Sequence, residues 1–120
     1  MASGTIQKTF HLLWTNSSPT SNYASQDVSL DLSSYAAVII IAKHATSDGR
    51  DIFSFCFVGD DGMLLSAEPS GTSPYVQVKT RYYSCYTNKI AFGAGRHGYP
   101  TGYQATDNAV MIPYKIYGIQ

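Results

Sequence analysis

The segment Gly93–Tyr103, which reads GAGRHGYPTGY, places a guanidinium, an imidazole and phenols within a few residues of one another. Such side chains combine hydrogen-bonding groups with apolar surface, as recognition surfaces do. The segment's four glycines and its proline predict a long surface loop, and loops of this length often carry function. We therefore predict a ligand-binding site formed by Arg96, His97, Tyr99 and Tyr103. The alternative is that these tyrosines only cover strand edges and subunit contacts.

Catalytic chemistry has little support in the residue pattern. None of the three histidines lies in a G-x-S-x-G hydrolase signature; they are His11, His44 and His97. Paired carboxylates occur only in segments that we expect to be turns, where Asp is common because it caps its own backbone. These pairs are Asp48 with Asp51 and Asp60 with Asp61. Residues 93–98 superficially match a dinucleotide-binding loop, but no helix follows them. We expect no catalytic residue and no enzyme activity.

The cysteines do not indicate a metal site. Cys56 and Cys85 lie inside strand-like runs, without a CxxC motif and without a histidine at ligand spacing. We expect two buried free thiols, with a disulfide as the less favoured alternative, because cytosolic folding keeps thiols reduced. The Asp-rich turns also lack the spacing of a calcium-binding EF-hand. We expect no metal and no cofactor.

The charge balance limits the classes of partner. Eight Lys and Arg residues balance eight Asp and Glu residues, so the formal net charge is zero. Binding to nucleic acid or anionic lipid as the main activity is excluded, because it needs a basic surplus on one face. Residues 1–10 lack a secretory signal, and no apolar run approaches the roughly 20 residues of a membrane span. The 14 Ser, 10 Thr and 10 Tyr residues instead indicate contacts with neutral polar ligands or with other copies of the chain.

Period-two alternation of Val, Ile, Phe, Tyr and Thr indicates an all-β protein. We predict one domain, residues 1–120, folded as an antiparallel β-sandwich of jelly-roll type with about eight strands and no helix. Turns and loops rich in Gly, Pro, Asn and Ser separate the strands, with the longer loops at residues 15–25, 67–74 and 93–103. The expected strands are residues 5–14, 27–32, 36–44, 52–58, 63–66, 75–86, 89–92 and 110–119.

Several strands carry positional information. Residues 36–44 are apolar on both faces, which indicates a central strand, and Asp48-Gly49 indicates the hairpin turn that follows it. Pro113 indicates an edge position or a bulge in the last strand. In the run 75–86, alternate residues form two sets. We expect Val76, Val78, Tyr82 and Tyr86 to face the core and Gln77, Lys79, Arg81 and Tyr83 to face solvent.

Three segments carry a resemblance to a known family. They are LWTN at residues 13–16 followed by SPTS at 18–21, VSLDLSSY at 28–35 leading into Ala37-Val38-Ile39, and the ending IPYKIYGI at 112–119. Together these segments resemble the C-terminal domains of fibre, baseplate and head-decoration proteins of tailed phages and prophages. The resemblance spans nearly the whole chain and assigns no catalytic or ligand-binding residue.

This resemblance implies a domain of the virion surface, made in the bacterial host cytoplasm and either complete or the distal part of a longer fibre. It implies a homotrimer that contacts other virion proteins and attaches to host carbohydrate, with no membrane insertion. One alternative is a structural capsid or tail decoration domain that binds only virion proteins and buries the Tyr, Arg and His segment in a subunit contact. A second alternative is a small polysaccharide hydrolase, which requires two close carboxylates in a groove.

Overall fold

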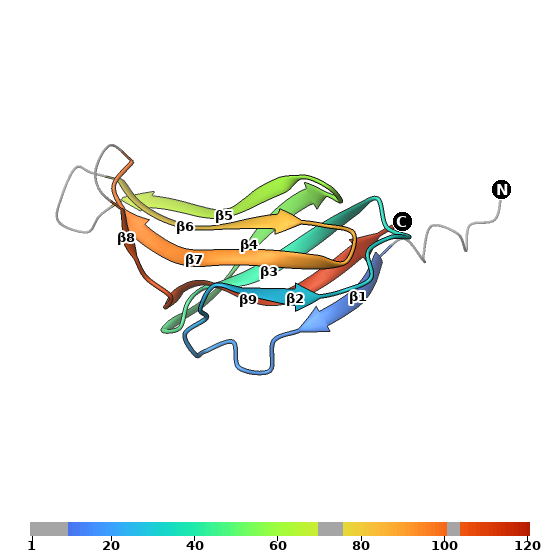
Figure 1. Cartoon of the computed structure of the whole chain (residues 1–120). Helices are drawn as coiled ribbons and strands as arrows, with labels where there is room; N and C mark the ends of the chain where they lie inside the picture. Colours follow the sequence, from blue (N-terminus) through green and yellow to red (C-terminus); the bar gives the residue numbers. More distant parts are fainter. Residues whose placement is uncertain (1–9, 70–75, 101–103) are drawn as a thin grey trace.

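The computed structural model describes residues 10–69, 76–100 and 104–120. These residues form nine strands and no helix, and the strands make two antiparallel sheets packed face to face (Figure 1). The predicted all-β sandwich is therefore confirmed, with one strand more than expected. The described residues also include no helix long and apolar enough to cross a membrane.

We call the four-stranded sheet sheet A and the five-stranded sheet sheet B. In spatial order, sheet A contains β1 (Phe10–Thr15), β9 (Val110–Ile119), β3 (Ala37–Ala45) and β4 (Asp48–Phe57). Sheet B contains β2 (Gln26–Ser29), β7 (Lys89–Gly98), β6 (Val76–Cys85) and β5 (Asp61–Pro69). The short strand β8 (Gln104–Thr106) pairs with the last residues of β7. The start of β1 pairs with the end of β9, and β8 lies at the opposite end of the molecule (Figure 1).

Strand β3 shows how alternation builds the core. Val38, Ile40 and Ala42 are fully buried between the sheets, whereas Ile39 and Ile41 point to the outer face of sheet A. The strand lies between β9 and β4, so the prediction of a central strand is confirmed. Other apolar residues buried in the core come from both sheets and the loops between them, and include Leu32, Leu64, Ile90, Phe92, Ile112 and Ile116.

A fully buried arginine crosses the core. Arg81 in β6 has no exposed surface, and its guanidinium donates three hydrogen bonds to backbone carbonyls. Nε reaches Met111 O at 2.8 Å, Nη1 reaches Gly93 O at 2.7 Å and Nη2 reaches Val110 O at 3.1 Å. Its carbon Cζ also lies 5.3 Å from the ring centre of Tyr23, within reach of a cation–π contact. Burial lowers the pKa of Arg81 to about 10, so the group stays charged at neutral pH.

From Arg81 to Tyr86, the two faces of the run 75–86 are the reverse of the prediction. Arg81, Tyr83 and Cys85 are buried, whereas Tyr82 and Tyr86 are exposed. Val78 is buried as expected, and Val76 is exposed. Hydrophobicity does not indicate these faces correctly, because the carbonyls that satisfy Arg81 belong to β7 and β9, 12 to 30 residues further along the chain.

The predicted loop at 93–103 is wrong over its first six residues, because β7 continues to Gly98. The register between β6 and β7 shifts by one residue between the pairs Tyr83–Phe92 and Arg81–Gly95, which is a bulge. A Cβ added at Gly95 would lie 2.2 Å from Asp107 O and 2.9 Å from Arg81 Nη2. Glycine is therefore needed here for close approach of the backbone rather than for a loop.

Other strand boundaries and positions also differ from the sequence expectations. Strand β5 extends to Pro69, into the expected loop 67–74, and β4 begins at Asp48, so the hairpin turn lies at Thr46 and Ser47. Pro113 is in β9, which is central rather than an edge strand. The register between β3 and β9 shifts at Pro113, so the alternative expectation, a bulge, is confirmed. Asn16 Nδ2 donates to Pro113 O at 2.9 Å beside this bulge.

Candidate functional site

Three of the four residues of the predicted site, Arg96, His97 and Tyr99, lie within the described structure. Arg96 and His97 are consecutive in β7, so their side chains leave the strand on opposite faces. His97 Nδ1 lies 2.7 Å from Asp107 Oδ2, which holds the ring against the β8–β9 connection. Tyr99 follows β7 and is exposed, and Tyr103 lies outside the described residues. The predicted site at Arg96, His97, Tyr99 and Tyr103 stays a prediction.

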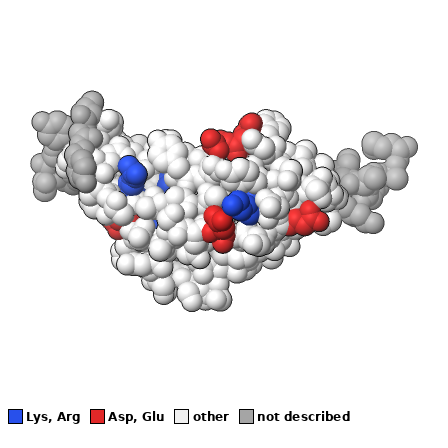
Figure 2. Space-filling model, in the orientation of Figure 1, with Lys and Arg blue, Asp and Glu red and all other residues white. Residues whose placement is uncertain are grey.

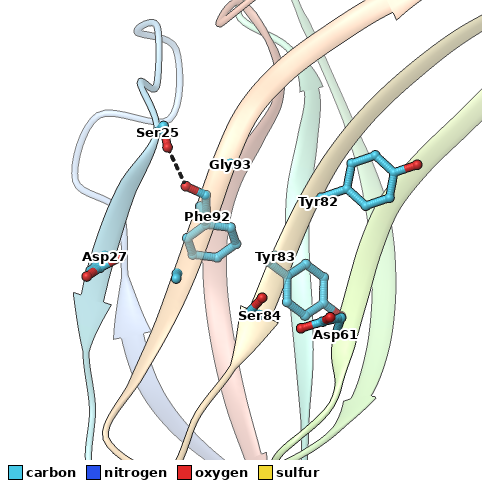
Figure 3. Close-up of a pocket in the computed structure, with 9 residues that line it drawn as sticks. Ser25, Asp27, Asp61, Tyr82, Tyr83, Ser84, Phe92 and Gly93 are labelled. Atoms are coloured by element: carbon cyan, nitrogen blue, oxygen red, sulfur yellow. Dashed lines mark hydrogen bonds between the residues drawn. The ribbon is translucent and has the colours of Figure 1, made fainter.

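A shallow hollow of about 370 Å³ lies on the outer face of sheet B (Figure 3). Four of its residues are consecutive partners across four strands and form one row: Asp27 in β2, Ala91 in β7, Ser84 in β6 and Asp61 in β5. The row has small side chains in the middle and a carboxylate at each end. The remaining lining residues are Ser25, Tyr82, Tyr83, Phe92 and Gly93.

The hollow combines an aromatic wall with hydroxyl groups. Tyr82 is 59% exposed and stands beside the row on the same face of β6 as Ser84 (Figure 3). Ser25 Oγ donates a hydrogen bond to Phe92 O at 3.0 Å and holds the start of β2 against β7. The site therefore offers a flat ring, two hydroxyl-bearing serines and carboxylate acceptors around a floor of small residues.

The charge around the hollow is low and partly neutralised. Asp27 Oδ2 accepts a hydrogen bond from Lys89 Nζ at 3.1 Å, and Lys89 also lies over the ring of Tyr86. Figure 2, drawn in the orientation of Figure 1, shows a few acidic and basic side chains standing apart on a largely uncharged surface. Asp61 closes the other end of the row. A neutral polar ligand suits this surface better than a strongly charged one.

Tyr83 supports the hollow from the core side and links the two sheets. Its hydroxyl lies 2.6 Å from Ser54 Oγ of β4, and Ser54 Oγ also reaches Met63 O of β5 at 3.3 Å. Burial raises the pKa of Tyr83 well above its ordinary value, so the phenol stays protonated. A Cβ at Gly62 would lie 2.3 Å from the Tyr83 ring, so glycine leaves room for this ring. The floor of the hollow is thus fixed by core packing.

The cysteines are free and buried, as expected. Burial raises the pKa of Cys85 to about 11 and also raises the pKa of Cys56. The thiolate is the reactive form of cysteine, so both groups are chemically quiet at neutral pH.

His44 is the most buried histidine among the described residues and joins the two sheets. Its Nδ1 lies 3.1 Å from Asp48 Oδ2, and its Nε2 lies 3.4 Å from Glu68 Oε1 without an aligned hydrogen bond. Arg50 Nη2 bridges the same two carboxylates, at 2.7 Å from Asp48 and 3.2 Å from Glu68. Hydrogen bonding by Arg50 holds the pKa of Asp48 well below its ordinary value. The cluster is an ion-pair network, and no three His, Cys, Asp or Glu side chains among the described residues are placed so that they could hold a metal ion.

Sequence reasoning missed the hollow because its residues come from four strands and none forms a local motif. The one available signal is the alternation that puts Tyr82 and Tyr86 on one face of the strand, but the sequence prediction places both tyrosines in the core. The fold and this site define a β-sandwich with a polar, aromatic-walled hollow on one sheet. No family model, curated protein or solved structure matches the chain.

Proposed function

We propose that this chain is an attachment domain of a phage virion surface protein, which binds host-cell carbohydrate as a homotrimer. The observation that carries the binding part of the proposal is the hollow on sheet B. An exposed tyrosine ring can stack on the apolar face of a sugar, while serine hydroxyls and carboxylates bond its hydroxyl groups. Tyr82, Ser84 and Asp61 supply these groups next to one another.

The spacing of the carboxylates supports binding rather than glycoside hydrolysis at this hollow. Asp27 and Asp61 are separated by three strand spacings, which places their Cα atoms about 14 Å apart. Glycosidases hold their two carboxyl groups about 5 to 9.5 Å apart. Asp27 is also paired with Lys89, which removes it further from the role of a free acid or base.

The virion-surface part of the proposal draws on the resemblance of residues 13–21, 28–39 and 112–119 to phage fibre and decoration domains. The geometry is compatible with it, because the start of β1 and the end of β9 lie together, away from β8 (Figure 1). An attachment through either chain end would leave the sides of both sheets and the end with β8 accessible. Tyr99 and Arg96 near that end are a second surface that could contact a ligand.

A glycan array probed with the purified protein tests the binding function. We expect retention of at least one class of neutral glycan, and binding about ten-fold weaker or worse for Tyr82→Ala. Tyr86→Ala is the matched control, because Tyr86 is an exposed tyrosine of the same region that does not line the hollow. An array without binding, or a Tyr82→Ala protein that binds like wild type, would overturn this assignment.

A structural decoration domain that binds only virion proteins is the second candidate. One observation favours it: the outer face of sheet A exposes Phe53, Phe55 and Phe57, which suits protein contacts better than sugar contacts. This candidate requires that Tyr82→Ala leaves adsorption of particles to host cells unchanged. Measurement of adsorption by particles carrying wild-type or Tyr82→Ala protein separates the two functions.

A further inference from the structure

The outer face of sheet A is apolar across all four of its strands. Phe53, Phe55 and Phe57 of β4 are 67%, 55% and 58% exposed, and Phe10 and Leu12 of β1 are 57% and 52% exposed. Half-buried apolar residues of the two central strands fill the space between them. We call this set the phenylalanine face: Phe10, Leu12, Ile39, Ile41, Phe53, Phe55, Phe57, Tyr117 and Ile119.

The strand register shows that the phenylalanine face is continuous. One row across the sheet is Leu12, Tyr117, Ile39 and Phe55. The next row is Phe10, Ile119, Ala37 and Phe57, and neither row contains a charged residue. The rings of Phe55 and Phe57 are 5.1 Å apart in an edge-to-face contact, so the outward rings form one surface rather than isolated groups.

Among the described residues, the charged side chains of this face lie at one end, where Lys115 is in the same row as Ile41 and Phe53, and they are already engaged. Lys43 Nζ donates to Asp51 Oδ1 at 2.7 Å and lies 4.6 Å from the ring centre of Tyr114. Lys115 lies 5.1 Å from the same ring. A strongly charged partner would find no unpaired opposite charge within the two apolar rows. The matching surface is another uncharged apolar face.

The size of the phenylalanine face fits a stable interface. Each of the four phenylalanines leaves about 100 Å² uncovered, given the usual area of an aromatic residue. With the leucine, isoleucine and tyrosine positions, the face reaches about 600 to 800 Å². A standard interface buries about 800 Å² on each partner, and the largest apolar patch of an ordinary monomer measures about 300 to 600 Å².

We infer that the phenylalanine face is the interface between copies of this chain, with the sheet A faces of the three copies packed against one another around their common axis. A second copy offers the same two uncharged rows and the same area, and these rows bring no charge into the contact. The inference rests on the oligomeric part of the proposed function and adds its location. It does not depend on sugar binding, because the hollow lies on the other sheet.

Light scattering coupled to gel filtration tests this inference on the full chain. We expect wild type to elute at a multiple of the chain mass, three-fold for a homotrimer, at micromolar concentration. The triple variant Phe53→Thr/Phe55→Thr/Phe57→Thr should be monomeric, with self-association weakened at least about ten-fold. Threonine preserves strand propensity, and circular dichroism checks that the variant is folded.

A matched control removes three exposed apolar side chains from sheet B instead. Leu65→Thr/Val76→Thr/Tyr86→Thr should keep the wild-type mass. If the control dissociates as far as the β4 variant, or if the β4 variant keeps the wild-type mass, the inference is wrong. A monomeric wild type that binds an apolar dye such as anilinonaphthalene sulfonate would also overturn it and leave the face to a different protein.

The outcomes separate this inference from the proposed function. A monomeric β4 variant that still binds glycan in solution supports an interface on sheet A and a sugar site on sheet B. A Tyr82→Ala protein that loses glycan binding but keeps the wild-type mass also supports a sugar site on sheet B that is separate from the interface. If the wild type is an oligomer but binds no glycan, the inferred interface stands and the proposed attachment function is wrong.

Discussion

Arg81 and the phenylalanine face each have the opposite exposure from the one their residue types predict. A charged guanidinium has no exposed surface, whereas three phenylalanines of β4 are more than half exposed. Arginine is rarely buried unless its donors are satisfied, and large apolar patches are rarely left open. Burial thus follows the available partners: three carbonyls cover Arg81, whereas the phenylalanines would be covered only by another apolar surface, as in the proposed oligomer.

The most damaging change should be Arg81→Met. The substitution removes three hydrogen bonds and leaves the carbonyls of Gly93, Val110 and Met111 without this donor. We expect a loss of about 4 kcal/mol in the free energy of unfolding, measured by denaturant titration. Arg81→Lys is the control, because one ammonium keeps the charge but cannot span three acceptors. Wild-type stability for Arg81→Met would mean that the buried charge is not needed.

The second test compares adjacent residues that face opposite sides of sheet A. Ile40 of β3 is fully buried. The preceding residue, Ile39, pairs with Phe55 of β4, and Phe55 is exposed. Ile40→Ala should cost about 3 kcal/mol because it leaves a cavity, and Phe55→Ala should cost less than about 1 kcal/mol in a dilute monomer. Denaturant titration at concentrations below self-association measures both. Equal costs would show that the phenylalanine face belongs to the core of the monomer.

A smaller effect is expected from Gly95→Ala, beside Arg81. The added Cβ would lie 2.2 Å from Asp107 O and 3.0 Å from Val110 O, so the backbone must shift. We expect a loss of about 2 kcal/mol in thermal or denaturant unfolding. Gly49→Ala is the matched control, because no atom lies within 4 Å of the added Cβ, and its stability should be unchanged or slightly higher. A neutral Gly95→Ala would contradict the close approach.

The smallest effect concerns an exposed charge, in contrast to the buried charge of Arg81. Hydrogen bonds from Arg50 hold the pKa of Asp48 below its ordinary value of 3.8. A lowered folded pKa means that this carboxylate stabilises the fold above pH 3.8 and loses that contribution as the pH falls further. Melting temperatures of wild type and Asp48→Asn should therefore differ slightly at pH 7, and the difference should shrink as the pH falls below 3.8. A melting-temperature difference that grows in acid would contradict the lowered pKa of Asp48.

Local patterns were sufficient for the sheet architecture and for β3, because its alternating apolar residues are covered on the inner face and half-covered on the outer one. For Pro113 they predict an edge position or a bulge, and the bulge is present. They failed in β6, where Arg81 is polar by type but buried by three distant carbonyls. They failed at Gly95 for the same reason, since the atoms that exclude a side chain belong to the β8–β9 connection.

The binding hollow was out of reach of local patterns. Asp27, Ser84 and Asp61 meet only through strand register, and register depends on the pairing of four strands. The polar, hydroxyl-rich composition did indicate neutral contacts, but it could not assign them to one sheet. The glycines of residues 93–98 predict a loop. In the structure they lie in β7, at a bulge and at the close approach of Gly95 to Asp107.

The place of β9 in sheet A has a consequence for synthesis of the chain. It is the final strand in sequence, yet it lies between β1 and β3, and β1 has no other partner in its sheet. Until residues 110–119 have left the ribosome, β1 cannot pair and Arg81 lacks two of its three carbonyls. Folding therefore completes after translation of β9, and a nascent chain stopped earlier presents open strand edges that favour aggregation.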